Sequence, residues 1–314
     1  MPLRVAIITT PGERFHKHLC AVITKRFNVV GVLHPAPRKQ GGGLLDLGAH
    51  RRAIEKRGIA FHLLQKLASN KVKSFGWDLQ KDVAGAEARF FPDAEADYQA
   101  TIAPMARIIE DINSPDSVRL LTDMKADVVV NSGGPIFKAP LLQAAPLVLN
   151  YHTGISPIYN GSDSVFWTYA NGQPHLTGGT LMVMNAGVDA GDMLAHYLPS
   201  VEPEDTPGRQ FMKTIAGGVA LYCSFLEHLE AARPFASAPQ GAPFHYTLGA
   251  DWSVHQNLMI ERRVRQDAAR KFARPEMVSV YWDKPSRMAA TDAARAFLSR
   301  LVYDPQINDS RQSV

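Results

Sequence analysis

The chain has 314 residues, which is enough for one large domain and a smaller one. Hydrophobic residues make up 46% of it and charged residues 20%, a balance that is typical of globular proteins and excludes wholesale disorder. The formal net charge of +4 is small for this length and argues against a nucleic-acid partner.

Strands and helices alternate from the N-terminus. A short apolar run at 4–10 (RVAIITT) predicts a strand, 14–26 a helix, and 28–33 (NVVGVL) a second strand. The next segment, 34–48, is rich in Pro, Gly and basic residues and predicts a long loop, to which the sequence assigns no role. A helix near 49–58 is expected to follow it.

The central part of the chain repeats this alternation. Ser-Pro-Asp at 114–116 predicts a helix start, and 126–131 (ADVVVN) is typical of a buried strand. A further strand is expected at 146–150 (PLVLN). We therefore predict an α/β fold: an open, mostly parallel, Rossmann-like sheet with helices on both faces. Ligands of such sheets bind beyond the carboxyl ends of the strands.

The last third of the chain predicts two more strands and a long helix before the composition changes. The strands are expected at 177–184 and 193–198, and the helix at 209–233. After residue 233 a Pro-, Ala- and Ser-rich stretch reads as a linker. We therefore expect an α/β domain at 1–233, and at 234–314 a linker with a small C-terminal region of unassigned role.

The two cysteines and the hydropathy pattern bear on location. Cys20 and Cys223 lie about two hundred positions apart and outside any metal-binding spacing, which argues against a disulfide framework or a zinc site. No run has the length of a membrane span, and the first apolar run is too short for a signal peptide. We expect a cytoplasmic protein without a membrane partner.

One segment carries residues suited to acyl chemistry. Asn150 and His152 stand two apart at the end of a strand, so their side chains leave it on the same face. An amide and an imidazole placed together can donate hydrogen bonds to one oxyanion. The later turn at 187–192 (GVDAGD) offers carboxylates, one of which could orient His152 and keep it protonated. Each residue alone is more often structural, but their occurrence together in one segment indicates a site.

The same segment resembles a known family. Asn-x-His followed by Pro and Gly, then Gly-x-Thr, then Gly-Val-Asp-x-Gly-Asp, is similar to the motif of formyltransferases. That family includes methionyl-tRNA formyltransferase, glycinamide ribonucleotide transformylase, sugar N-formyltransferases and formyltetrahydrofolate deformylase. The similarity covers roughly 114–228. It implies an enzyme of one-carbon metabolism that transfers a formyl group from 10-formyltetrahydrofolate to an amine and needs no metal.

The resemblance also implies roles for individual residues. Asn150, His152 and Asp189 match the catalytic trio of the family. Two loops are implied in binding the folate pterin, and their residues are Gly134, Pro135, Ile136, Phe137, Asn185, Ala186, Gly187 and Val188. We expect Tyr159 and Gly161 to contact the acceptor.

The sequence departs from the family in ways that bear on the acceptor. Gly154 stands where the family has a serine, and the first turn at 9–15 lacks the Gly-rich loop expected for a ribonucleotide acceptor. The C-terminal part lacks the spaced strands of the tRNA enzyme's terminal barrel. We therefore expect a small-molecule amine acceptor, whose identity the sequence leaves open together with the oligomeric state. Two alternatives remain: hydrolysis of 10-formyltetrahydrofolate to formate and tetrahydrofolate, and folate binding without turnover.

Overall fold

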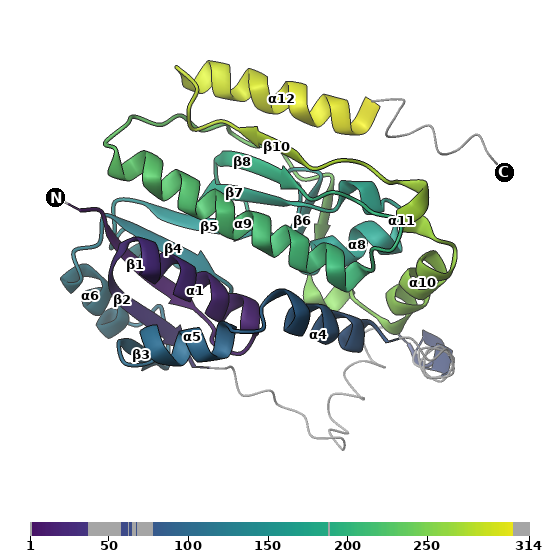
Figure 1. Cartoon of the computed structure of the whole chain (residues 1–314), viewed down its shortest axis with the longest axis horizontal. Helices are drawn as coiled ribbons and strands as arrows, with labels where there is room; N and C mark the ends of the chain where they lie inside the picture. Colours follow the sequence, from purple (N-terminus) through teal and green to yellow (C-terminus); the bar gives the residue numbers. More distant parts are fainter. Residues whose placement is uncertain are drawn as a thin grey trace.

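The computed structural model describes residues 2–36, 58–61, 63–64, 67, 78–187 and 189–303. Most of the predicted loop at 34–48 and of the predicted helix near 49–58 lies outside these residues. The centre of the molecule is an eight-stranded sheet in the order β10-β8-β7-β5-β4-β1-β2-β3 (Figure 1). Its strands are β1 (Arg4–Thr9), β2 (Asn28–Pro35), β3 (Ala106–Ile109), β4 (Val128–Ser132), β5 (Val148–His152), β7 (Gly179–Val183), β8 (Met193–Leu198) and β10 (Met277–Val280).

The sheet is mixed, with a parallel half and an antiparallel half. Strands β3, β2, β1, β4 and β5 pair in parallel, whereas β7, β8 and β10 join through antiparallel pairs. The central parallel strands β1 and β4 are short runs rich in β-branched residues that are buried on both faces, as expected when helices cover a parallel sheet on both sides. The predicted open, mostly parallel α/β fold is confirmed.

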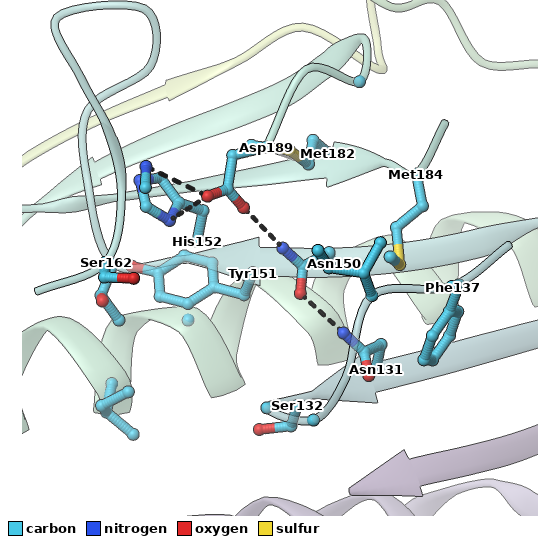
Figure 2. Close-up of a pocket in the computed structure, with 18 of the residues that line it drawn as sticks. Asn131, Ser132, Phe137, Asn150, Tyr151, His152, Ser162, Met182, Met184 and Asp189 are labelled. Carbon is cyan, nitrogen blue, oxygen red and sulfur yellow. Dashed lines mark hydrogen bonds and ion pairs between the residues drawn. The ribbon is translucent and has the colours of Figure 1, made fainter. Parts of the chain in front are cut away.

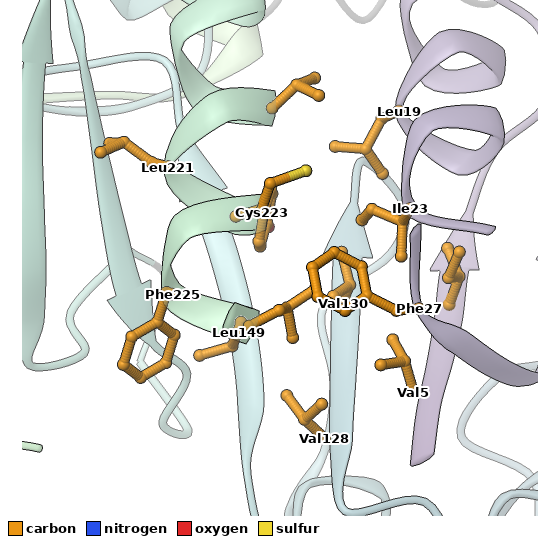
Figure 3. Close-up of a cluster of buried hydrophobic side chains, with 14 of the residues drawn as sticks. Val5, Leu19, Ile23, Phe27, Val128, Val130, Leu149, Leu221, Cys223 and Phe225 are labelled. Atoms are coloured by element: carbon orange, nitrogen blue, oxygen red, sulfur yellow. The ribbon is translucent and has the colours of Figure 1, made fainter. Parts of the chain in front are cut away.

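Helices cover the sheet on two sides. The helices are α1 (Arg14–Arg26), α4 (Leu79–Phe90), α5 (Ala94–Thr101), α6 (Pro115–Asp123), α7 (Ala139–Leu142), α8 (Ser164–Ala170), α9 (Pro207–Glu230), α10 (Val254–Arg265), α11 (Ala268–Lys271) and α12 (Arg287–Tyr303). One core cluster joins α1 and α9 to one face of the sheet, with Leu19 and Cys223 against Val5 and Val130 (Figure 3). The other face packs against α6 and α7. Alternate residues of β1 and β4 point into the two clusters, so that the helices on both faces hold these strands in place.

The residues beyond 233 pair with strands that precede them. The short strand β9 (His245–Thr247) lies parallel to β6 (Tyr159–Gly161) in a separate two-stranded sheet, while β10 forms the edge of the main sheet beside β8. Helix α12 follows β10 and lies along this edge (Figure 1). The division of the chain into two parts at residue 233 stays a prediction. The pairing of β9 with β6 brings the residues around β9 to the cavity described next.

Candidate active site

A cavity of about 560 Å³ lies at the carboxyl edge of the parallel strands. The strand order reverses beside β1, which has β2 on one side and β4 on the other, and open α/β sheets bind ligands beyond the strand ends at such a point. The lining comes from the β4–α7 loop, the end of β5, the β7–β8 turn, the helices α1 and α9, and the strand β9. Segments far apart in the sequence therefore share one cavity.

The three residues predicted to be catalytic meet at this cavity (Figure 2). Asn150 and His152 lie on β5, and Asp189 lies in the β7–β8 turn. The Asp189 carboxylate lies between the other two side chains. His152 Nδ1 is 3.4 Å from Asp189 Oδ2, and Asn150 Nδ2 donates to Asp189 Oδ1 at 3.4 Å. The amide, the imidazole and the carboxylate thus face one small region of the cavity.

The backbone of Asp189 is held in an unusual conformation. Its φ of 49° lies in the left-handed region, which non-glycine residues rarely adopt. The Asp189 carbonyl accepts hydrogen bonds from Asn160 Nδ2 at 2.8 Å and Gln240 Nε2 at 2.7 Å. The backbone N–H of Gly161 donates to Asp189 Oδ2 at 3.2 Å. These contacts fix both the turn and the direction of the carboxylate.

The other side of the His152 ring is anchored in the protein interior. His152 is 7% exposed, and its Nε2 lies 3.0 Å from the Tyr159 carbonyl oxygen and 3.3 Å from Ser164 Oγ. A carbonyl oxygen can only accept, so Nε2 donates there, while Nδ1 faces the Asp189 carboxylate. Nε2 therefore holds the ring on one side, and Nδ1 is the nitrogen that is left to face the carboxylate.

Gly154, at the position where the family has a serine, makes this anchoring possible. A Cβ at residue 154 would overlap with His152 Nε2 and with the Tyr159 carbonyl oxygen. The Ser164 hydroxyl, from α8, instead provides an oxygen beside the same nitrogen. Thr180 braces the loop, because its Oγ1 donates to the Gly154 carbonyl at 2.7 Å.

Asn131 sets the orientation of Asn150. Its Nδ2 donates to Asn150 Oδ1 at 2.9 Å, which turns the NH₂ group of Asn150 toward Asp189 (Figure 2). Asn131 is 7% exposed, and its Oδ1 is buried without a hydrogen-bond partner in the part of the chain that the structure describes. The Asn150 amide is therefore oriented from the neighbouring strand, β4.

The residues predicted to bind folate lie along one wall of the same cavity. Its lining includes Gly134, Pro135, Ile136, Phe137, Asn185 and Gly187. Ala186 lies in the same turn but not in the lining, and Val188 lies outside the described residues. Met182 and Met184, which the sequence did not single out, also line the cavity, and Met184 packs against the buried cluster that contains Phe137 (Figure 2).

The two residues predicted to contact the acceptor are placed differently from each other. Gly161 lines the cavity. Tyr159 does not: its side chain is 1% exposed, and its hydroxyl is engaged by Gln173 at 2.5 Å and Asn171 at 3.0 Å. In the structure Tyr159 presents its backbone carbonyl to His152, and its ring is buried outside the cavity lining. The reason is that β6 turns the ring inward, where it stacks on His245.

Several residues of the site were missed from the sequence. Asn131 ends a predicted strand and could have been found by pairing that strand with the one carrying Asn150. Gln240 falls in the predicted linker, and Asp163 is a single carboxylate between two serines, so no local signal marks either one. His16, on α1, also lines the cavity; its Nδ1 lies 2.8 Å from Ser132 Oγ, and burial lowers its pKa to about 4.

Among the described residues, no group of three or more His, Cys, Asp or Glu side chains is arranged to hold a metal ion. No helix among them combines the length and the apolar character needed to cross a membrane.

Comparison with known proteins relates the middle of the chain to one family. Residues 97–223 match the family described as Formyl transferase. Methionyl-tRNA formyltransferase of Desulforamulus reducens is 34% identical over 104 residues, which are 33% of this chain and 32% of that protein. The protein of the same name from Solibacter usitatus is 31% identical over 144 residues, 45% of this chain and 46% of that one. The chain thus spans between a third and a half of the length of these curated relatives.

A solved structure is also similar to the chain. It is a sugar N-formyltransferase from Shewanella sp., which is 15% identical, with a TM-score of 0.48 over 82% of this chain and 86% of that one.

Proposed function

We propose, from the premise that residues 97–223 belong to the formyl transferase family, that the chain transfers a formyl group from 10-formyltetrahydrofolate to a primary amine. The observation that carries the proposal is the meeting of Asn150, His152 and Asp189 at one cavity. Two hydrogen-bond donors and a carboxylate are the groups that acyl transfer to an amine requires: donors for the developing oxyanion and a base for the proton.

The lining of the cavity fits a reduced folate. Ile136, which is 61% exposed, and the partly buried Met184 offer an apolar surface for a flat ring, and Gly133 and Gly134 have positive φ values of 72° and 127°. Backbone without side chains therefore lines the cavity at these two positions, where a ring can approach closely. The donor, when bound, supplies an activated formyl carbon to the reaction.

The residues of the chain act on the formyl oxygen and on the proton of the amine. Asn150 donates from its amide as negative charge develops on that oxygen. His152 does the same from Nδ1, whose 3.4 Å contact with Asp189 is long for a hydrogen bond and leaves the N–H free to be shared. Asp189 balances the charge of the imidazolium and receives the proton from the amine. A new C–N bond forms, the bond from the formyl carbon to the folate nitrogen breaks, and that nitrogen ends protonated.

The proposal is tested by following both products of the reaction. The protein is incubated with 10-formyltetrahydrofolate and a panel of primary amines, tetrahydrofolate is measured by absorbance, and the formamide by mass spectrometry. We expect His152→Gln and Asp189→Asn to lower kcat by about 10² to 10³, the usual cost of losing one oxyanion donor or its support. Asn suits position 189 because it tolerates a left-handed backbone.

Three results would contradict the proposal. Formate released at the same rate with and without amine would favour hydrolysis. Donor binding without turnover would favour a folate-binding protein. Unchanged kcat in both variants would remove His152 and Asp189 from the chemistry.

The proposed acceptor is an amine of small molecular size, and the proposed location is the cytoplasm. The buried, unbridged thiols of Cys20 and Cys223 agree with a reducing compartment. Because some relatives are named methionyl-tRNA formyltransferase, the amine of methionyl-tRNA is the alternative acceptor. The panel of amines therefore includes methionyl-tRNA.

A further inference from the structure

The part of the cavity lining that is not implied in folate binding has a distinct chemical character. We call it the acceptor wall and define it by Phe15, His16, Asp163, Phe211, Tyr246 and Leu248. We infer that this wall selects a primary amine with an apolar body and no phosphate, and that Asp163 receives its ammonium group. The inference rests on the proposed formyl transfer and names the class of its acceptor.

The acceptor wall is largely aromatic and aliphatic. Phe15 of α1 and Phe211 of α9 meet edge to face, with ring centroids 5.5 Å apart. Tyr246 and Leu248 lie two apart, at β9 and directly after it, and are 46% and 53% exposed. Large apolar side chains exposed at the rim of a cavity indicate contact with an apolar ligand. The body of the acceptor therefore finds carbon surface on two sides.

Apart from the proposed imidazolium of His152, which Asp189 balances, the charged side chains of the cavity are negative. Within the described ranges, no Lys or Arg lines it, and its two acidic side chains are Asp163 and Asp189. His16 adds no positive charge near neutral pH, since burial lowers its pKa to about 4. A phosphate held here would lack the cationic partners that usually bind one.

The start of α1 is also closed to a phosphate. The N-terminus of a helix is a common phosphate site because its first N–H groups lack partners within the helix. In this chain Glu87 of α4 accepts a hydrogen bond from the backbone N–H of Phe15 at 3.2 Å. A protein carboxylate thus occupies the position that a ligand anion would take.

Asp163 is the residue suited to receive a cation. It precedes α8 with a φ of 60°, in the left-handed region, and its side chain does not cap the helix. Its carboxylate is open to the cavity and has no hydrogen-bond or ion-pair partner among the residues described. Desolvation by the surrounding protein raises the pKa of this carboxyl. A bound ammonium group would offset that desolvation. The Asp163 carboxylate beside it can also take the extra proton of the ammonium before the amine attacks the formyl carbon.

With Asp163 in this role, both protons lost by the ammonium group have an acceptor. The ammonium gives one proton to Asp163, which passes it to solvent, and the neutral amine then attacks the formyl carbon. The second proton leaves the nitrogen as the C–N bond forms and ends on the folate nitrogen that departs. The products are a formamide and tetrahydrofolate.

A matched pair of amines tests the inference. Tyramine and tyramine O-phosphate have the same amino group and ring and differ only in the phosphate. We expect kcat/KM for tyramine to exceed that for the phosphate by at least about tenfold, with methionyl-tRNA a poor acceptor. Asp163→Asn should raise the KM for tyramine about tenfold and leave the KM for the donor unchanged. Asp163→Lys should shift the preference toward tyramine O-phosphate, and Asp123→Asn, an exposed change on α6, should alter neither KM.

The outcomes separate this inference from the proposed function. Preference for the phosphorylated amine or for methionyl-tRNA would overturn the acceptor class and leave formyl transfer standing. An unchanged tyramine KM in both Asp163 variants would overturn the role of Asp163. Formate release with no formamide from any amine would instead overturn formyl transfer itself.

Discussion

Replacing Gly154 with alanine probes the anchoring of the His152 imidazole, to which we assign a catalytic role. The added Cβ would overlap with His152 Nε2 and the Tyr159 carbonyl oxygen, and it would lie 2.8 Å from Ser164 Cβ. All three neighbours are buried or backbone atoms, so the ring must move by roughly 1 Å to restore ordinary contact distances. A misplacement of that size in a catalytic group costs about 10²-fold in rate. We therefore expect kcat to fall about 10²-fold in Gly154→Ala.

The same change should also lower stability by a measurable amount. Overpacking a buried site costs about 1–3 kcal/mol, and weakening the 3.0 Å bond from His152 to Tyr159 adds about 1 kcal/mol. Urea unfolding gives the free energy of unfolding, and steady-state kinetics with the donor give kcat and KM. The matched control is Gly85→Ala on α4, where an added Cβ meets nothing within 4 Å. A Gly154→Ala protein with kcat within twofold of wild type would refute the idea that this close packing positions the ring.

Three further predictions concern residues that support the site. Asn131→Leu removes the 2.9 Å bond that orients the Asn150 amide, so kcat should fall about tenfold while the donor KM changes less than about threefold, as measured by steady-state kinetics. Gln240→Ala removes a 2.7 Å bond to the Asp189 carbonyl, and kcat should fall about tenfold with an unchanged circular dichroism spectrum; a melted spectrum would assign the residue to folding instead. For His16, burial lowers the pKa from 6.5 to about 4, so the unfolded chain binds the extra proton between these values and stability is lost as the pH falls from about 6.5 to 4. His16→Gln should flatten that loss by up to about 1.4 kcal/mol per pH unit in urea titrations at pH 5 and 6, and an unchanged slope would contradict the assignment.

The strands that carry the site could be predicted because their signal is local. The runs that became β1, β4 and β5 are short, apolar and β-branched, and each ends at polar or glycine residues. The spacing of Asn150 and His152 then places both side chains at one edge of the sheet. The glycines on either side of Asp189 indicated a tight turn that could bring its carboxylate back toward these two residues. The structure shows why glycine is needed there, because a Cβ at Gly191 would overlap with the Val183 carbonyl.

The supporting contacts could not be predicted because they join distant segments. Gln240 reaches the Asp189 turn from 51 positions later in the chain, out of a stretch whose composition indicates only a linker. The role expected of Tyr159 depended on the direction of its ring, which is decided by the pairing of β6 with β9. Such pairing follows from the tertiary structure, and no pattern within either short strand predicts it.

The acceptor wall lies partly outside residues 97–223, the region that matches the formyl transferase family, and this bears on how specificity for the amine arises. The proposed catalytic trio and the wall implied in folate binding lie within 97–223, whereas Phe15, Tyr246 and Leu248 of the acceptor wall lie outside it. Chemistry on the formyl group requires the same donors whatever the amine is, so the part of the chain that holds them can stay similar among proteins with different acceptors. The acceptor wall has no such constraint, because its shape needs to fit only one amine. If the acceptor wall sets specificity, exchanging β9 and its flanking residues between this chain and a formyltransferase with another acceptor should change the KM for the amine more than the KM for the donor.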